Sequence, residues 1–596
     1  MIYIHPEFKE RWIFVTNIAE IISFIIRILT PVFGIVIVFL CFSSLRYGRR
    51  EEHALIVLDD EFRGIRYPVL FWENSIGRSR NSDIRINDPV VSRDHAVLLR
   101  RDDGWFITDT GSKMGVLVND HKTSGRQAVY IGDKITIGTS ILTVKRADNY
   151  TDISSNSRIK IKKKKENKTV PCSLILALIT IFTGLLCFEA MINMNNIDAF
   201  YPAAIFVIFM WIFYAVSKSK FKRRSFELES LALFLSDIGI MLSASHDLRQ
   251  SFVQLAATVV GSVVFCFIIW FIEIPDRVAK WRLIISIAAI GLLGMTVVLG
   301  KVQNGAQNWI IIGPVSIQPS EFVKIAYIFV GASTLDQLQT KKNLIGFIIV
   351  TGLCVGLLFY MSDFGTAVIF FVTFLIISFM RSGNIKTVIL AVTAAALGAL
   401  LILSVKPYIM DRFAIWGHVW DDPTDKGYQQ VNTLIYCASG GLFGVGLSSG
   451  YLQYIFASES DLVFGLTCEE LGCLMALLIT AVIGGFMLYA RGVTTRSRST
   501  FYSIAACSAA GLLVFQSALN IFGATDILPL TGVTLPFISE GGSSMVSCWG
   551  LLAFIKAADE RTYSGKRLKP KKEAHKKSKY QDISSYSDAD QDYVEI

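Results

Sequence analysis

The chain has 596 residues, of which 52% are hydrophobic and only 18% are charged, and its mean hydropathy is +0.48. A soluble chain of this length would carry charge on about a quarter of its residues, so the composition excludes an ordinary soluble protein. Apolar runs of roughly 18–22 residues recur, the length that spans a bilayer core. The net charge of +9 gathers beside the ends of these runs, as in cytoplasmic loops, and is not a nucleic-acid signal.

The first apolar run, 21–45, predicts a membrane span. Three arginines follow it (Arg46, Arg49 and Arg50), which places its C-terminal end in the cytoplasm. The run lacks a small-residue cleavage site, so we interpret it as an anchor rather than a signal peptide. Arg27 interrupts the run, and we interpret it as an interfacial or snorkelling position.

Residues 52–146 change character. Short alternating segments such as WFITD and GVLVN are separated by Gly, Asn and Asp turns, the pattern of an all-β sandwich. The basic run KIKKKKENK at 160–168 then predicts a solvated tether near anionic lipid headgroups. The ten cysteines form no CxxC or Cys/His cluster, which argues against a zinc site or a disulfide framework.

The remaining apolar runs predict two extra spans followed by ten more. They lie near 172–192, 200–217, 229–245, 251–272, 281–300, 320–337, 344–360, 363–381, 387–405, 466–490, 501–522 and 541–557. Under this count the basic connections fall on one side, and the polar loops 301–319, 406–465 and 523–540 fall on the other. The β domain and the C-terminus are therefore expected in the cytoplasm and loop 406–465 outside the cell.

The expected fold is a multi-domain, polytopic α-helical membrane protein with an all-β sandwich. Its expected parts are an anchor (1–50), the β domain (51–148), a basic linker (149–171), an extra transmembrane hairpin (172–224), the membrane domain (225–560) and a disordered tail (561–596).

The β segment resembles a forkhead-associated (FHA) domain. The resemblance rests on IGRSRNSDIRINDPVVSRDHAVL (76–98), followed by WFITDTGSKMGVLVND and YIGDKITIG. It implies a phosphothreonine-binding site with Arg78 and Ser92 on the phosphate, Arg93 beside the peptide and His95 as a loop buttress. Guanidinium and hydroxyl groups suit phosphate oxygens. Met114 stands where the family usually has an asparagine, which implies weaker binding or altered specificity. The alternative is a sandwich whose polar loop residues only hold turns.

The membrane domain resembles the SEDS family of RodA, FtsW and their sporulation relatives over roughly 229–557. Six ordered segments carry the resemblance: GAQNWIIIGPVSIQPSEFVKI (305–325), SDFGTA (362–367), DDPTDKGYQQ (421–430), ASGGLFGVGLSSG (438–450), ESDLVFGLTCEELG (459–472) and LPLTGVTLPFISEGGSS (528–544). The resemblance implies a ten-span peptidoglycan glycosyltransferase that polymerises lipid II at the outer membrane face, beside a class B penicillin-binding protein.

Glycosyl transfer from a polyprenyl diphosphate needs a base near the acceptor hydroxyl and positive charge near the leaving diphosphate. The resemblance implies that Asp422, which precedes Pro423 in the family's D-P-x-x-x-G-Y pattern, is the base. Asp421 and Asp425 are expected to be loop charges. The resemblance further implies a substrate-binding set, namely Glu321, Lys324, Trp309, Asp363, Asp461 and Glu469.

Glu321 and Lys324 are spaced i, i+3 on one face of a predicted helix. Charges within a membrane are costly and suggest function, although mutual neutralisation is the structural alternative. Four positions depart from the family pattern: Met361, Ser362, Asn308 in place of an arginine, and Glu540 in place of a tyrosine. Losing one cation and gaining one anion would weaken diphosphate binding or shift it toward a metal ion.

Two other functions fit the same residues. A lipid II flippase would need the cavity charges but no outer base, and a catalytically weak scaffold would use the β domain to recruit a threonine-phosphorylated protein. A divalent cation, Mg²⁺ or Mn²⁺, is compatible with diphosphate chemistry, but no ligand cluster declares one and no residue is assigned as a metal ligand. The sequence leaves elongation, division and sporulation open.

Overall fold

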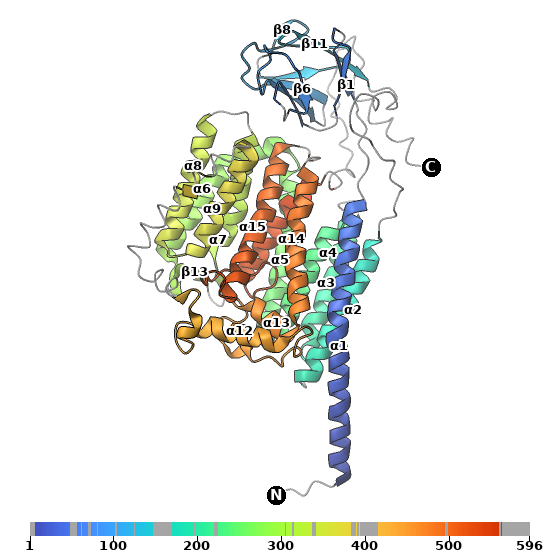
Figure 1. The fold of residues 1–596 in the computed structure, drawn as a ribbon, viewed down its shortest axis with the longest axis vertical. Helices are drawn as coiled ribbons and strands as arrows, with labels where there is room; N and C mark the ends of the chain where they lie inside the picture. Colours follow the sequence, from blue (N-terminus) through green and yellow to red (C-terminus); the bar gives the residue numbers. More distant parts are fainter. Residues whose placement is uncertain are drawn as a thin grey trace.

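The structure is a computed structural model in which a β-sandwich lies at one end of a bundle of helices (Figure 1). It describes residues 6–47, 56–60, 62–69, 73–79, 82–101, 104–123, 125–146, 170–194, 197–219, 225–303, 306–312, 315–336, 341–382, 389, 392–393, 415–494, 497, 499–559 and 562. The expected combination of a polytopic helical protein and an all-β domain is confirmed.

Two sheets form the sandwich, in the orders β2-β1-β11-β10-β7-β8 and β4-β3-β5-β6-β9. The strands are β1 (Ile56–Asp60), β2 (Ile65–Val69), β3 (Glu73–Gly77), β4 (Ile84–Arg85), β5 (Ala96–Arg101), β6 (Gly104–Asp109), β7 (Val116–Val118), β8 (His121–Lys122), β9 (Arg126–Val129), β10 (Lys134–Ile137) and β11 (Ser140–Arg146). Their alternation turns Ile76, Leu98 and Ile107 into a fully buried core between the sheets.

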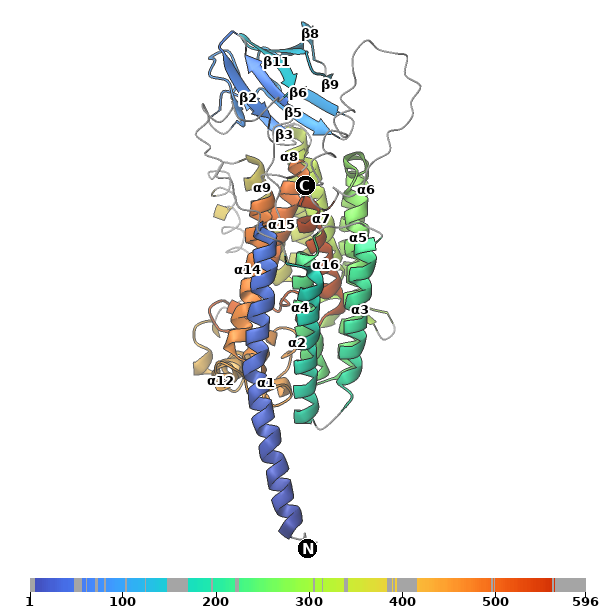
Figure 2. The same cartoon turned by 90° about the vertical axis from the view of Figure 1, so that its right-hand side faces the viewer.

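Three N-terminal helices stand beside the rest of the bundle: α1 (Pro6–Tyr47), α2 (Cys172–Met194) and α3 (Phe200–Ser219). The first of them, α1, extends beyond the bundle at the end away from the sandwich (Figure 2). It packs along α2, α4 and α14. The packing is close, because a Cβ added to Gly485 of α14 would lie 2.0 Å from the ring of Phe42.

The remaining long helices are α4 (Glu227–Ala244), α5 (Leu248–Ile272), α6 (Pro275–Leu299), α7 (Pro319–Asp336), α8 (Lys341–Tyr360), α9 (Phe364–Ser382), α14 (Cys473–Thr494), α15 (Thr500–Ala524) and α16 (Gly542–Ala558). Among the described residues, seven helices are long and apolar enough to cross a membrane, and three shorter apolar helices accompany them. The predicted span at 387–405 lies almost entirely outside the described residues.

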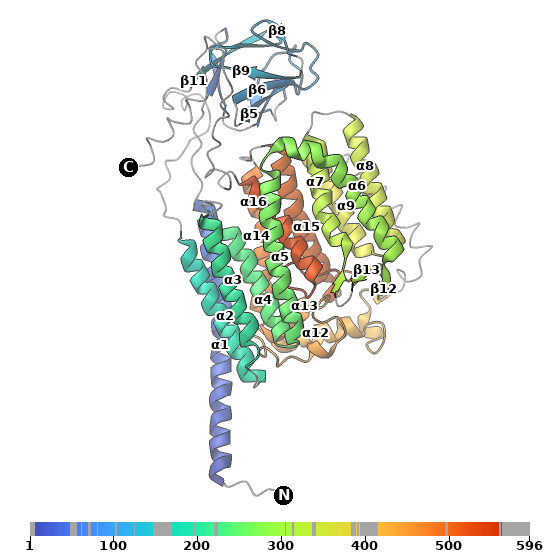
Figure 3. The ribbon, with the colours of Figure 1, turned by 180° about the vertical axis from the view of Figure 1, so that it is seen from behind.

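The polar loops are structured at the end of the bundle opposite the sandwich (Figure 3). They form β12 (Lys301–Gln303), β13 (Ala306–Ile312), β14 (Val315–Ile317), η2 (Val419–Asp421), α12 (Tyr428–Gly440), η3 (Leu452–Tyr454) and α13 (Val463–Glu470). The span expected near 466–490 is present as α14, but it begins only at Cys473, because the helix is interrupted between α13 and α14. Gly472 has φ +89° there, and a Cβ on it would meet the carbonyl oxygen of Leu442 at 2.4 Å.

Candidate functional site

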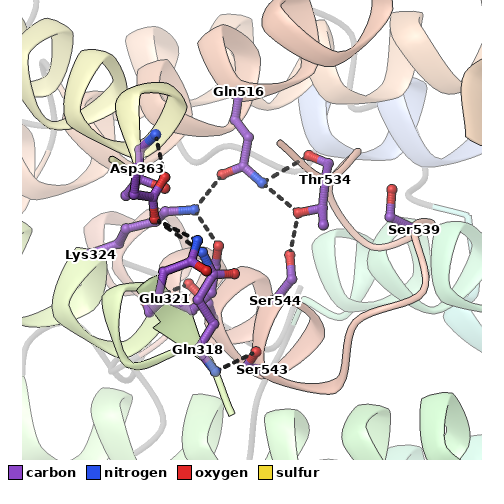
Figure 4. A network of polar contacts seen from close by, with 12 residues as sticks. Gln318, Glu321, Lys324, Asp363, Gln516, Thr534, Ser539, Ser543 and Ser544 are labelled. Carbon is purple, nitrogen blue, oxygen red and sulfur yellow. Dashed lines mark hydrogen bonds and ion pairs between the residues drawn. The ribbon is translucent and has the colours of Figure 1, made fainter. Parts of the chain in front are cut away.

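A polar network buried within the bundle begins in the first turn of α7. The Lys324 Nζ donates to Glu321 Oε1 over 2.7 Å and to Gln516 Oε1 of α15 over 2.9 Å (Figure 4). Lys324 is only 1% exposed and Glu321 only 4%. Because both charges are removed from water, each depends on the other for its stabilisation.

Gln516 extends this network from α7 to α16. Its Nε2 donates to the carbonyl oxygen and to Oγ1 of Thr534, over 2.9 and 3.0 Å, and Thr534 Oγ1 lies 2.6 Å from Ser544 Oγ (Figure 4). Sequence reasoning did not select Gln516 or Thr534. The available signal was a glutamine inside the apolar run 501–522, since buried amides need partners.

Asp363 lies next to this network, at the start of α9. Its carboxylate accepts hydrogen bonds from Asn308 Nδ2 at 3.1 Å, from Gln318 Nε2 at 3.3 Å and from the backbone N–H of Thr366 at 3.2 Å. Asn308 therefore directs a neutral donor at Asp363 where the family usually has a cation. Trp309, the next residue on β13, is half-buried.

Buried oxygens of this region that lack a hydrogen-bond partner among the described residues include Glu321 Oε2 and Asn308 Oδ1. Buried acceptors are normally satisfied, so these are the atoms that a polar ligand would engage. Among the described residues, the cation of this region is Lys324, beside the carboxylates of Glu321 and Asp363.

Asp422 lies in a tight turn between η2 and α12. Its carbonyl oxygen accepts from the backbone N–H of Gly427 at 2.9 Å, and its Oδ2 lies 3.4 Å from the backbone N of Lys426. A Cβ on Gly427 would lie 2.2 Å from the carbonyl oxygen of Val419, which explains the glycine of the D-P-x-x-x-G-Y pattern. The Asp422 side chain is half-buried, whereas Asp421 and Asp425 are exposed.

Asp461 and Glu469 differ in their surroundings. The carbonyl oxygen of Asp461 accepts from Asn520 Nδ2 of α15 at 2.9 Å. Both carboxylate oxygens of Glu469 accept backbone N–H groups, from Tyr451 at 2.7 Å and from Leu452 at 2.9 Å, and the residue is buried. Glu469 thus braces a loop, and its substrate contact stays a prediction.

Glu540 is paired with Glu459 just before α16. Its backbone N–H donates to the carbonyl oxygen of Glu459 at 2.8 Å. Burial, together with the hydrogen bond and charge of the Glu459 carboxylate, raises the pKa of Glu540 to about 9. Glu540 therefore holds a proton at neutral pH, so it does not add the full anion that the sequence suggested.

The phosphothreonine-site candidates are grouped at one edge of the sandwich. The backbone N–H of Arg78 donates to the carbonyl oxygen of Ser92 at 3.0 Å, which ties the loops of Arg78, Ser92 and Arg93 together. His95 is fully buried beneath them: Nδ1 accepts from the backbone N–H of Ser92 at 3.1 Å, and Nε2 lies 3.0 Å from the carbonyl oxygen of Gly115. The buttress role of His95 fits this geometry.

The backbone N–H of Lys113 donates to Ser92 Oγ over 3.2 Å, and Met114 beside it is 58% exposed. The loop that carries the family departure therefore contacts the candidate phosphate site directly.

No group of three or more His, Cys, Asp or Glu side chains that could hold a metal ion occurs among the described residues. We assign no catalytic step to a metal ion.

These features define a multi-pass membrane protein with a buried polar network, a structured polar face and an attached β-sandwich. The FtsW/RodA/SpoVE family model, described as a cell cycle protein, matches residues 231–564, and the FHA domain model matches residues 74–138. The chain belongs to the FtsW/RodA/SpoVE family and carries an FHA domain.

Two relatives, compared by sequence, agree with this assignment. The chain is 31% identical over 361 residues to the protein named Probable peptidoglycan glycosyltransferase FtsW of Dichelobacter nodosus, covering 57% of this chain and 91% of that protein. It is 27% identical over 343 residues to the peptidoglycan glycosyltransferase RodA of Mycobacterium tuberculosis, covering 53% and 72%. The crystal structure of Thermus thermophilus RodA aligns at 21% identity over 56% of this chain and 95% of that one, with a TM-score of 0.42.

Proposed function

We propose that this chain is a peptidoglycan glycosyltransferase that polymerises lipid II into glycan strands at the outer face of the plasma membrane. The observation that carries the proposal is the pairing of two features in one family member. A half-buried acid, Asp422, lies in the polar face of the bundle, and a buried cation, Lys324, lies in the second turn of α7. The helix α7 follows β14, which pairs with β13 in the same polar face (Figure 1).

In this proposal Asp422 accepts the proton of the acceptor sugar's 4-hydroxyl. The resulting oxygen attacks the anomeric carbon of the donor, and the bond to undecaprenyl diphosphate breaks with inversion. Lys324 attracts the diphosphate, while Gln516 and Glu321 hold its ammonium group in place. Trp309, Asp363, Asp461 and Glu469 remain proposed substrate-binding positions.

The polar face and the sandwich lie at opposite ends of the bundle (Figures 1 and 3), which supports an orientation with the FHA domain and the C-terminus in the cytoplasm and loop 406–465 outside. The division into an anchor (1–50), an FHA domain (51–148), a linker (149–171), a hairpin (172–224), a glycosyltransferase domain (225–560) and a tail (561–596) is part of the same proposal.

Purified protein given labelled lipid II tests the catalytic assignment. We expect Asp422→Asn to abolish polymer, because the amide cannot take the proton, while the neighbouring variants Asp421→Asn and Asp425→Asn keep it. Polymer made by Asp422→Asn at the wild-type rate would remove Asp422 from the mechanism. If folded wild-type protein makes no polymer but moves lipid II across vesicle membranes, the protein is a flippase and not a polymerase.

The FHA domain is proposed to bind a threonine-phosphorylated protein and so link polymerisation to phosphorylation. Arg78, Ser92 and Arg93 supply the charge and hydroxyl that a phosphate needs. A phosphothreonine-peptide pulldown with Arg78→Ala tests this, and the exposed Arg126→Ala on β9 is the matched control. Equal binding by both variants would count against the phosphate role. A class B penicillin-binding protein is the proposed partner on the membrane side.

A further inference from the structure

The three N-terminal helices lie outside the segment matched by the family model, which begins at residue 231. Two of them nevertheless reach the polar face. Arg27 Nη1 of α1 donates to the carbonyl oxygen of Gly444 over 2.9 Å, and Asn193 Nδ2 of α2 donates to the carbonyl oxygen of Leu447 over 2.7 Å. Arg27, interpreted from the sequence as an interfacial or snorkelling position, thus has a specific partner in the loop between α12 and η3.

Side chains from both helices converge on one glycine of that loop. Gly446 is buried and has φ +106°, and a Cβ placed on it would lie 2.9 Å from Asn193 Nδ2, 3.1 Å from Glu189 Oε1 and 3.6 Å from Arg27 Cδ. A glycine is needed there both for its conformation and for this close approach. The loop therefore fits a cradle that side chains of α1 and α2 form on one side of it.

Opposite charges link α1 to α2 within the cradle. Glu189 is 1% exposed and is attracted to Arg27, whereas Glu470 of α13 is a like charge that repels it. Ionised side chains in apolar spans are costly, and they are retained where they make specific contacts. Arg27 and Glu189 both lie in such spans.

The other side of the loop is bonded to α13. The backbone N–H groups of Val445 and Gly446 donate to the carbonyl oxygens of Glu469 and Glu470, over 2.8 and 3.0 Å. Glu470 Oε1 lies 3.0 Å from His246 Nε2, and the backbone N–H of Ser448 donates to Glu470 Oε2 at 3.3 Å. The loop is thus held between the N-terminal helices and α13.

This loop follows α12, whose first turn begins directly after the Asp422–Gly427 turn. The C-terminal end of α12 packs closely on α13, because a Cβ on Gly440 would lie 2.1 Å from the carbonyl oxygen of Cys468. A helix of 13 residues spans about 20 Å, and it is anchored at its far end by the braced loop. Displacing the loop would therefore tilt α12 and move the Asp422 turn.

We propose that α1 and α2 act as a brace in which Arg27 and Asn193 are positioning residues for the Asp422 turn. The catalytic half of this inference rests on the proposed function, whereas the structural half does not. The family's membrane domain carries the reacting groups, and the added N-terminal helices fix the loop that orients one of them.

Hydrogen–deuterium exchange and steady-state kinetics on the purified full chain test the brace. We expect Arg27→Met and Asn193→Leu to speed exchange in the peptide containing Val445 and Gly446 by roughly tenfold, the factor expected for losing one buried hydrogen bond. We also expect kcat for lipid II polymerisation to fall by about tenfold or more with KM nearly unchanged, because orientation rather than binding is lost.

Two variants serve as controls. Arg27→Lys keeps a charged donor and should recover much of kcat. Thr30→Val on the same helix removes a hydroxyl that donates to the carbonyl oxygen of Ile26 within α1, and it should match wild type. Unchanged exchange in both Arg27→Met and Asn193→Leu overturns the brace, and faster exchange with wild-type kcat overturns the positioning role. If wild type makes no polymer, the proposed function fails, but exchange still decides whether the brace exists. If Arg27→Met does not fold, Asn193→Leu and Arg27→Lys carry the test.

Discussion

Replacing Lys324 by methionine tests whether the ion pair between Lys324 and Glu321 has a function or only a structural role. The Lys324 ammonium lies 2.7 Å from Glu321 Oε1, and neither residue is more than 4% exposed. Removing the cation leaves a buried carboxylate whose Oε2 already lacks a partner among the described residues. Breaking such a buried pair costs about 3–5 kcal/mol, so Lys324→Met should be strongly destabilised.

The double variant Glu321→Gln/Lys324→Met removes both charges and the penalty with them. Replacement of a whole buried pair by neutral groups of similar size is often close to neutral, so we expect its stability to return to within about 1–2 kcal/mol of wild type. Denaturant unfolding in detergent, followed for wild type, both single variants and the double variant, gives the coupling energy directly.

Polymerisation of labelled lipid II by the same four proteins then assigns the role. If Lys324 attracts the diphosphate, the double variant is stable and inactive, and Lys324→Met is inactive for the same reason. A stable double variant that polymerises at the wild-type rate would show mutual neutralisation only. Wild-type stability of Lys324→Met alone would refute the buried-pair reasoning from which the magnitude is derived.

Three further predictions follow from single contacts. The folded protein holds a proton on Glu540 that the unfolded chain loses above about pH 4.5. The contribution of this group to the free energy of unfolding therefore falls as the pH rises from about 4.5 to about 9. Glu540→Gln should flatten the dependence of the melting temperature on pH over that range. Glu73 of the FHA domain accepts the backbone N–H of Thr500 at 2.8 Å, which caps α15, so Glu73→Ala should cost about 0.5–2 kcal/mol in denaturant unfolding and speed exchange of that amide. Gly427→Ala puts a Cβ 2.2 Å from the carbonyl oxygen of Val419, so we expect polymerase activity to fall by about tenfold or more.

Each of the three has a specific contradiction. Parallel pH profiles for wild type and Glu540→Gln would mean that the carboxyl group titrates normally. Equal amide exchange at Thr500 with and without Glu73 would remove the contact between the two domains. Gly484→Ala on α14, where an added Cβ meets nothing within 4 Å, is the control for Gly427→Ala, and equal activities would show that the Asp422 turn tolerates displacement.

The long membrane spans could be predicted from the sequence, because a span is recognisable from its apolar composition alone. The helix α4 shows where that signal weakens, since all 18 of its residues are buried although three are acidic. Ser44 donates to Glu227 at 2.7 Å, Lys556 to Glu229 at 2.9 Å and Thr183 to Asp237 at 2.7 Å. The hydropathy of a sequence is lowered by these acids, but it does not identify their hydrogen-bond partners, which lie 54 to 327 residues away.

The candidate site divides in a similar way. Family motifs selected Glu321, Lys324 and Asp363 because these residues stand in conspicuous polar loops and helix starts, whereas Gln516 was passed over inside an apolar run. Arg27 is the clearest case. Its charge in an apolar span was interpreted from the sequence as an interfacial or snorkelling position, whereas in the structure its partner is a backbone carbonyl oxygen 417 residues away. Every residue has that carbonyl group, so no side-chain pattern marks which one is used. The partner carbonyl group is determined only by the fold, which turns Gly444 and Gly446 toward α1 and α2. A brace made of side chain to backbone contacts therefore cannot be detected by comparing motifs, even where the catalytic motif that it supports is easily recognised.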